Sequence, residues 1–321
     1  MNWITLSHTI IFNTEFNDEL DIQLISTYKK IIFSDYALTN KLFKCYKNKD
    51  FYNKKLRFRG SKFNKNISEL PKDVIHLTFG FKFNQDVSVL PHSLIDLTFG
   101  THFNQDVSVL PPTLTHLTFG WYFNQDVSRL PPFLTHLTFG WKFNQDVLNL
   151  PHGLTHLTFG NDFNQDISNL PPTLTHLEFG EDFDQNISNL PPTLTHLTLG
   201  FSFKQEIIFH PNIKYLKLNS NNKFVINSLP NSIVELEIDY NFNLEMNNLP
   251  TSIKKILIVK SSRYDMDLNC LSDFVEELHL NRYYEKRIFC IPRNLKKIVC
   301  NKDYPYKDDF IMRGVKICEY D

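Results

Sequence analysis

A 20-residue repeat dominates this chain of 321 residues. From Leu70 to Gly200 a Leu-Pro pair recurs every 20 residues, and a glycine lies nine residues after the proline of each pair. Seven such units succeed one another without a slip, and weaker copies continue to about residue 299, which makes about twelve units. Because one short unit cannot bury its apolar side chains alone, the chain must stack its units against one another.

Each unit contains one segment with the alternation of a half-buried strand. In the unit that begins at Leu110, Leu117 and Phe119 are expected to face inward, and Phe123, Val127 and Leu130 to return to the interior. The glycine that ends the strand indicates a position where a Cβ atom would be unfavourable. Roughly thirteen residues, often with two prolines, separate the strands, so the return segment is expected to be extended rather than helical.

The repeat predicts an α+β repeat protein, a solenoid of parallel strands with about twelve 20-residue units and a small N-terminal helical cap. The strand pattern L-x-x-L-x-[LF] resembles that of leucine-rich repeats, which favours a leucine-rich-repeat-like solenoid. A parallel β-helix is the alternative. Three regions follow: an N-terminal helical module at 1–58, seven regular repeats at 59–200, and degenerate repeats with a C-terminal cap at 201–321.

The recurring motifs FNQD[VI] and LPxxLTHLTFG are similar to the FNIP repeat, a leucine-rich-repeat relative found largely in slime moulds and giant viruses of amoebae. The resemblance covers residues 60–200 strongly and 201–300 weakly. The unit here is slightly shorter than the common form, and FNQD[VI] replaces FNxPI. The resemblance implies an interaction scaffold for a target protein, without enzymatic activity or cofactor, because the family has no known catalytic motif.

Composition excludes some classes of function and favours one cellular location. The 34 Lys and Arg against 35 Asp and Glu leave a net charge of −1, which rules out a globally basic nucleic-acid binder. No apolar run approaches the roughly 18 residues that span a bilayer. The five cysteines are odd in number and form no CxxC pair, and the first residues lack the basic start of a secretory signal. These features favour an intracellular, cytoplasmic location, which is the host cytoplasm if the protein is viral.

The N-terminal module has helical spacing of its apolar residues. Leu20 and Leu24, with the apolar residues up to Ile32, predict a helix capped by Asn17 or Asp18, and a run from Leu38 predicts a second. Such a module could simply cap the open end of the solenoid.

Residues 37–58 also resemble the second half of an F-box, a module that family members often pair with FNIP repeats. That resemblance implies binding to a Skp1-like adaptor of a cullin-type ubiquitin ligase, although the usual Leu-Pro opening is replaced by EFNDEL. The candidate adaptor-binding residues are Leu20, Leu24, Leu38, Leu42 and Phe43. A third alternative is attachment to nucleic acid or an acidic membrane through the basic, aromatic stretch 29–65; it is disfavoured because the aromatic residues fall at core spacing.

The exposed register of the strands carries a row of histidines that only Asp96 interrupts. Its members are His76, His116, His136, His156, His176 and His196. The row could hold metal, respond to pH, or contact a partner as a solvated polar ladder. The last interpretation is favoured and no metal is predicted, because a straight row diverges whereas zinc ligands must converge. The residues from His116 to His196 are therefore candidate partner contacts.

Two further positions of the repeat have residues that indicate a role. Asparagines in the FNQD turn are predicted to be structural, by satisfying turn backbone groups: Asn84, Asn104, Asn124, Asn144 and Asn164. The position after the glycine varies, and aromatic residues there, with one neighbour, are candidate partner contacts: Phe81, Trp121, Tyr122, Trp141 and Phe201. The alternative is that the two tryptophans form only a local stacking lid.

Overall fold

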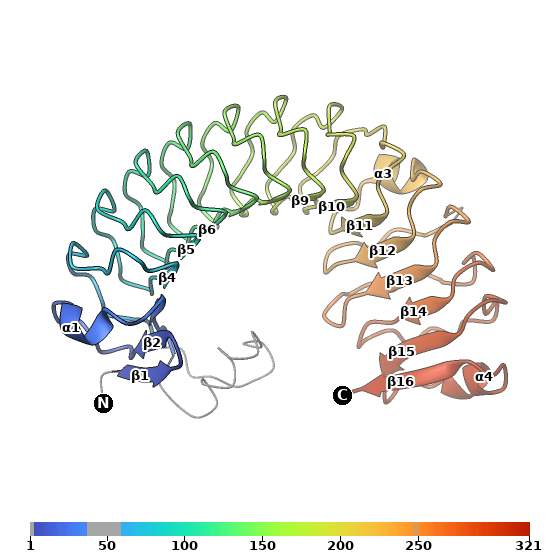
Figure 1. Cartoon of the computed structure of the whole chain (residues 1–321). Coiled ribbons are helices and arrows are strands. Elements are labelled where there is room, and N and C mark those ends of the chain that lie inside the picture. Colours follow the sequence, from blue (N-terminus) through green and yellow to red (C-terminus); the bar gives the residue numbers. More distant parts are fainter. Residues whose placement is uncertain (1–2, 37–58, 248) are drawn as a thin grey trace. The chain divides into compact units, whose positions relative to one another are not determined.

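The computed structural model describes residues 3–36, 59–247 and 249–321, and the chain forms two compact units, Met1–Phe163 and Asn164–Asp321. Both units are built from short strands that follow one another in chain order (Figure 1). Together they contain about fourteen turns of a parallel-strand solenoid. The predicted fold class is confirmed, with slightly more turns than the twelve expected.

The first unit begins with an antiparallel hairpin, and the later strand pairs among its described residues are parallel. Its register places equivalent residues of successive repeats side by side, such as Leu117 beside Leu97 and Leu137. In chain order the elements are β1 Trp3–Leu6, β2 Thr9–Phe12, α1 Ile22–Ile25, β3 Lys30–Phe33, β4 His76–Thr78, β5 Asp96–Thr98, β6 His116–Thr118, β7 His136–Thr138 and β8 His156–Thr158.

The second unit continues the same construction with parallel strands throughout. Two return segments contain a short helix, so the prediction of extended returns holds for the regular repeats and fails in these degenerate ones. The elements are β9 His176–Glu178, β10 His196–Leu199, β11 Tyr215–Leu218, α3 Lys223–Asn227, β12 Glu235–Ile238, β13 Lys255–Ile258, β14 Glu277–His279, β15 Lys297–Asn301, α4 Lys307–Ile311 and β16 Lys316–Tyr320.

Two ladders of phenylalanine fill the interior of the regular repeats. The ring of Phe139 lies 3.7 Å from that of Phe143 in its own coil and 5.7 Å from those of Phe119 and Phe159 in the neighbouring coils, measured between ring centroids. Phe139 is only 3% exposed. The inward positions expected from the sequence, Phe123 among them, are all buried, because each ring is covered by its copies in the coils above and below.

The glycine that ends each strand is explained by close approach between coils. A Cβ atom built on Gly140 would lie 1.9 Å from the carbonyl oxygen of Gly120, and the same clash recurs at Gly100, Gly120 and Gly160. None of these glycines has the positive φ that only glycine adopts readily. The residue is therefore required by the space between backbones and not by backbone conformation.

The N-terminal residues correct one expectation. The helix predicted up to Ile32 is a single turn, α1, whose cap is Asp21 and not Asn17 or Asp18: the Asp21 carboxylate accepts the N–H of Gln23 at 2.9 Å. Residues 30–33 form strand β3, which pairs with β2 and β4. Strand pairing overrides the helical spacing here because Ile31 and Ile32 are covered by the neighbouring strands.

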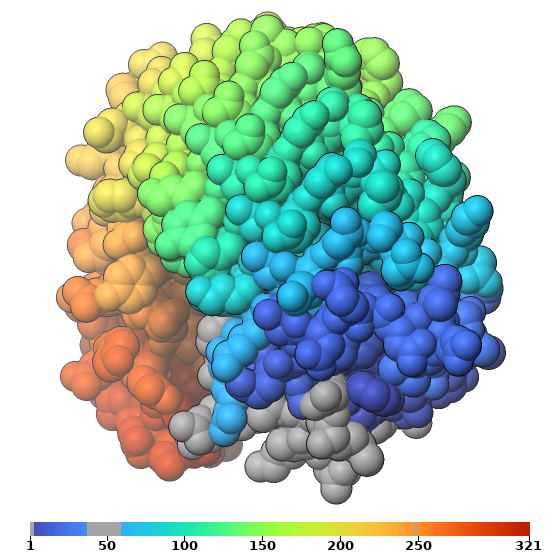
Figure 2. Space-filling model, turned by 90° about the vertical axis from the view of Figure 1, so that its left-hand side faces the viewer, coloured from blue at the N-terminus to red at the C-terminus, as the bar shows by residue number. Residues whose placement is uncertain are grey.

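Residues 3–36 are therefore the first coils of the solenoid rather than a separate helical cap. In Figure 2 these residues, in blue, lie against the first regular repeats, in cyan. Strands β3 and β4 pair directly although His76 lies 46 positions after Lys30 in the sequence. Residues 37–58, on which the F-box resemblance depends, lie outside the described residues.

Candidate functional site

Trp121 and Trp141 lie in the turns that follow β6 and β7. Main-chain hydrogen bonds between successive coils hold these turns in register. The N–H of Tyr122 donates to the carbonyl oxygen of Thr101 at 3.0 Å, and the N–H of Lys142 donates to the carbonyl oxygen of Trp121 at 2.9 Å. The two indole rings stack with centroids 4.4 Å apart and planes 10° apart. They remain 43% and 39% exposed. The stack therefore presents a flat aromatic surface to solvent at the edge where the strands end.

A second aromatic row runs beside this stack in the same unit. The ring of His102 lies 4.4 Å from Phe81 and 5.3 Å from Tyr122. Its Nδ1 lies 2.9 Å from the carbonyl oxygen of Phe81. Sequence reasoning missed His102, although it occupies the same repeat position as Tyr122. Phe201, the remaining aromatic candidate, is exposed in the second unit after β10.

The histidines form stacked rows on the solvent face of the strands. In the first unit, ring centroids lie 4.3 Å apart for His116 and His136 and 4.2 Å apart for His136 and His156. In the second unit, His176 and His196 lie 4.0 Å apart. His76 stands outside this pattern, since its Nδ1 faces the carboxylate of Asp96 at 3.6 Å.

The threonine before each of the five stacked histidines contacts the Nδ1 atom of that histidine. Thr135 Oγ1 donates its proton to the carbonyl oxygen of Thr115 at 3.1 Å and lies 2.9 Å from Nδ1 of His136. A hydroxyl has one proton, so Nδ1 of His136 must donate, which leaves Nε2 as an acceptor. Burial, followed by the charges of His156 and His116, lowers the pKa of His136. Both effects favour a neutral imidazole at His136.

The asparagine ladder connects the turns of successive coils. The Asn104 side-chain oxygen accepts the N–H of Asn124 at 2.9 Å and the amide of Gln125 at 3.0 Å. The same pair of bonds links Asn124 to the next coil. In the second unit Asn164 accepts the corresponding bonds from its neighbour. Each asparagine thus satisfies a turn N–H that the strand ladder leaves open.

The arrangement of the histidines bears on the question of metal ligation. Across residues 3–36, 59–247 and 249–321, no three His, Cys, Asp or Glu side chains gather as a metal site. The stacked histidines lie side by side and do not converge on one point.

Of the adaptor-binding candidates, Leu20 is 6% exposed and belongs to the core, and Leu24 is half-buried. Leu38, Leu42 and Phe43 lie outside the described residues.

The family known as FNIP Repeat matches the chain at residues 63–102, 123–162, 143–182 and 220–261. The chain contains FNIP repeats. These matches include Trp141 and most of the phenylalanine ladders and asparagine turns described above, whereas Trp121 lies between two matched segments. They confirm the resemblance drawn from the FNQD[VI] and LPxxLTHLTFG motifs.

A solved structure with a TM-score of 0.70 extends this result to the fold. The FNIP-repeat chain is similar to CroV588 of the giant virus CroV, described as a novel circular leucine-rich-repeat protein, with 30% identity and a TM-score of 0.70. The match covers 95% of this chain and 51% of CroV588, so the chain spans about half the length of that protein. The functional domain of InlJ from Listeria monocytogenes is 15% identical, with 91% of this chain and 67% of that chain covered and a TM-score of 0.49.

No curated protein matches the chain. None of the helices in the described part of the FNIP-repeat chain has the length and apolar character needed to cross a bilayer.

Proposed function

We propose that this FNIP-repeat chain is a non-enzymatic scaffold that binds a target protein through the Trp121–Trp141 stack, with the histidine row of the first unit as a polar flank. The observation that carries the proposal is the exposure of two stacked indoles at a position where the fold accepts polar residues. Leucine-rich-repeat-like folds are typical of interaction scaffolds. The location that suits this role is intracellular, in the cytoplasm, and in the host cytoplasm if the protein is viral.

The repeat itself supplies the argument that the tryptophans are not needed for folding. Thr101 and Asn161 occupy the same position in other coils of the first unit. Core packing therefore does not demand an indole there, whereas aromatic clusters of this kind dominate the binding energy of many protein interfaces. A purely structural or decoy surface is the alternative, in which the stack only covers the turns.

The double change Trp121→Asn and Trp141→Asn is expected to weaken target binding by roughly a hundredfold or more, if each indole contributes over about 1.4 kcal/mol. The fold should persist, because Asn161 already occupies this position in the chain. The affinity for a co-purified target is measured by calorimetry, and the thermal unfolding of the variant is compared with that of the unchanged chain.

Phe133→Thr is the matched control. Phe133 is an exposed aromatic residue in the same unit, but it precedes β7 instead of following it. Thr113 occupies the equivalent place and donates to the carbonyl oxygen of Leu94 at 2.7 Å, so threonine fits. The control should bind the target normally. Unchanged affinity in the folded tryptophan variant would show that the stack is only a lid and that the interface lies elsewhere.

A second proposed role is that of a substrate adaptor, in which residues 37–58 bind a Skp1-like protein of a cullin-type ubiquitin ligase. One observation favours a separate role for this segment. His76 lies 46 positions after Lys30, far more than the 20-residue repeat period, yet β3 and β4 are direct neighbours. The described residues on either side of the segment are bonded to each other, since the N–H of Arg59 donates to the carbonyl oxygen of Asp35 at 2.9 Å, so changing side chains of the segment should leave the sheet intact.

The triple change Leu38→Ala, Leu42→Ala and Phe43→Ala tests this role. If the insertion binds the adaptor, the variant should lose a co-purifying Skp1-like protein and keep its target and its unfolding temperature. Deleting residues 1–58 is a poorer test, because it would also remove β1, β2 and β3 from the sheet. Retention of the adaptor by the triple variant, or its absence from the unchanged protein, would contradict the adaptor role.

A further inference from the structure

Two exposed cysteines, Cys270 and Cys290, occupy the same repeat position in adjacent coils of the second unit. Both have free thiols, and each stands directly before a buried apolar residue of its coil. The strands that follow them, β14 and β15, pair with Glu277 beside Lys297. The offset of this pairing equals the 20 positions between the two cysteines, so the sheet register places one cysteine beside the other.

Hydrogen bonds join the two coils on both sides of the cysteines. The side-chain oxygen of Asn269 accepts the N–H of Cys290 at 3.0 Å. Three residues further along, the carboxylate of Asp273 accepts the N–H of Arg293, also at 3.0 Å. The coils are therefore in direct contact just before and just after Cys270, and the register set by the strands continues through the return segment.

The spacing of the coils suits a disulfide. Stacked aromatic rings outside the sheet report this spacing in the coils on either side: the ring centroids of Phe242 and Tyr264 lie 6.1 Å apart, and those of Tyr284 and Tyr304 lie 6.3 Å apart. Disulfides join residues whose Cα atoms are about 4.4–6.8 Å apart. Equivalent positions in adjacent coils of this unit therefore fall within the range that a disulfide can bridge.

The fold does not require cysteine at this repeat position. Val89, Val109 and Arg129 occupy it in the regular repeats, and all three are exposed. Core packing therefore places no demand on the side chain there. An exposed thiol is also accessible to a reagent in solution, which a buried thiol is not.

We propose that Cys270 and Cys290 are a site of reversible oxidation, at which a small-molecule disulfide converts the two thiols into a bridge between adjacent coils. In a reducing compartment such bridges are transient and respond to the redox state. The bridge closes a loop of the chain across two coils and restricts their separation. The site shares no residue with the tryptophan stack, so it does not depend on that stack binding a target.

Glutathione disulfide serves as the oxidant, and the reaction consists of two successive exchanges. The thiolate of one cysteine attacks a sulfur of glutathione disulfide, so that its S–S bond breaks and one glutathione thiolate leaves. The thiolate of the second cysteine then attacks the protein sulfur of this mixed disulfide and releases the other glutathione. The two protein thiols give up two electrons and two protons in total, which reduce glutathione disulfide to two molecules of glutathione.

Peptide mapping by mass spectrometry tests the proposal on the full chain, after incubation with glutathione disulfide at about pH 8, near the pKa of a free thiol. Digestion without reductant should give one peptide pair joined through Cys270 and Cys290, and dithiothreitol should abolish it. The single variants Cys270→Ser and Cys290→Ser should stop at the first exchange. The remaining cysteine of the pair should then keep a glutathionyl group.

Cys300 and Cys318 provide an internal control. They also lie in adjacent coils, on β15 and β16, but Cys318 is paired with Val299 and not with Cys300. Because successive residues of a strand point to opposite faces, the two thiols lie on opposite sides of the sheet. No peptide joined through Cys300 and Cys318 is expected. Its appearance would show that the exchange joins thiols without regard to the native geometry, which would overturn the proposal.

The bridged chain should unfold at a temperature about 5 °C higher than the same chain after reduction, because the bridge restricts the unfolded state. An equal or lower unfolding temperature would show that the native coils do not meet at bridging distance, and would contradict the proposal. So would free thiols at both positions after incubation, or a lasting mixed disulfide at either. A disulfide from Cys270 or Cys290 to Cys45 or to a second chain would also overturn it.

Discussion

Replacing Phe139 with aspartate is expected to destabilise the first unit by at least about 4 kcal/mol, because the change removes a buried ring and buries an unpaired charge. The ring of Phe139 contacts that of Phe143 and lies between those of Phe119 and Phe159. A solenoid transmits such damage mainly to neighbouring coils. Thermal unfolding should shift strongly downward, and limited proteolysis should cleave near the altered coil.

His136→Asp is the control for this experiment. His136 is three residues away in the same coil but lies on the solvent face, and Asp96 already occupies the same register in β5. The control should change stability by less than about 1 kcal/mol. Equal damage from the two changes would refute the assignment of inward and outward positions.

Replacing Gly140 with alanine is expected to cost about 3 kcal/mol or more, since the added methyl group would overlap backbone that cannot move away cheaply. The new Cβ would lie 1.9 Å from the carbonyl oxygen and 2.3 Å from the carbonyl carbon of Gly120. Two coils would have to separate, which would strain the main-chain bonds between them. The measurement is the free energy of unfolding in denaturant.

Gly153→Ala provides the matched comparison in the next coil. A Cβ atom at Gly153 would meet only the carbonyl oxygen of Leu134, at an ordinary 3.6 Å. Other coils have Ser93 or Thr113 at this place. The change should be neutral or should stabilise by about 0.4–1 kcal/mol, because it restricts the unfolded chain. If both alanine variants behave alike, close approach is not the reason for the repeated glycine.

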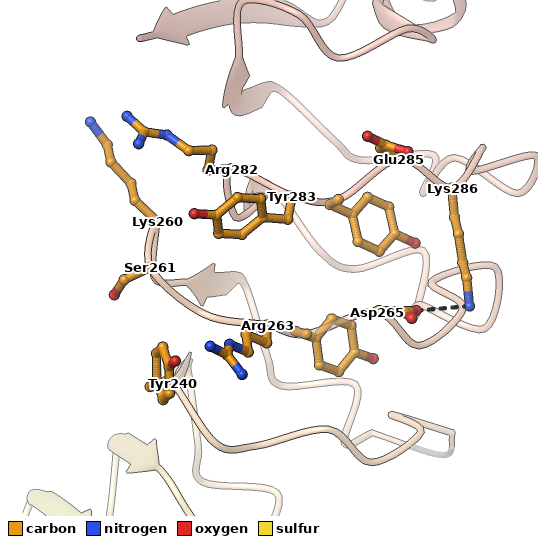
Figure 3. Close-up of a pocket in the computed structure, with 11 residues that line it drawn as sticks. Tyr240, Lys260, Ser261, Arg263, Asp265, Arg282, Tyr283, Glu285 and Lys286 are labelled. Carbon is orange, nitrogen blue, oxygen red and sulfur yellow. Dashed lines mark ion pairs between the residues drawn. The ribbon is translucent and has the colours of Figure 1, made fainter.

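The candidate site was only partly predictable from the sequence. The repeat marks Trp121 and Trp141 as variable neighbours, and the structure shows them stacked and exposed. The second unit also contains a pocket beside the turns that follow β12, β13 and β14 (Figure 3), and the sequence does not predict this pocket. Lys260 and Arg282 are 22 residues apart in degenerate repeats, and only the pairing of successive coils reveals that they line one space.

The repeat period by itself determined the parallel solenoid and the buried positions, because identical units can satisfy their apolar faces only by stacking in register. The repeat period also located the glycine that ends each strand. Only the tertiary structure shows why glycine is required there, because the distance between Gly120 and Gly140 depends on how the coils stack. Residues 30–33 were decided by tertiary structure alone. Their short apolar run fits a helix or a strand, and pairing with β2 and β4 selects the strand because the neighbours supply hydrogen bonds and cover Ile31 and Ile32.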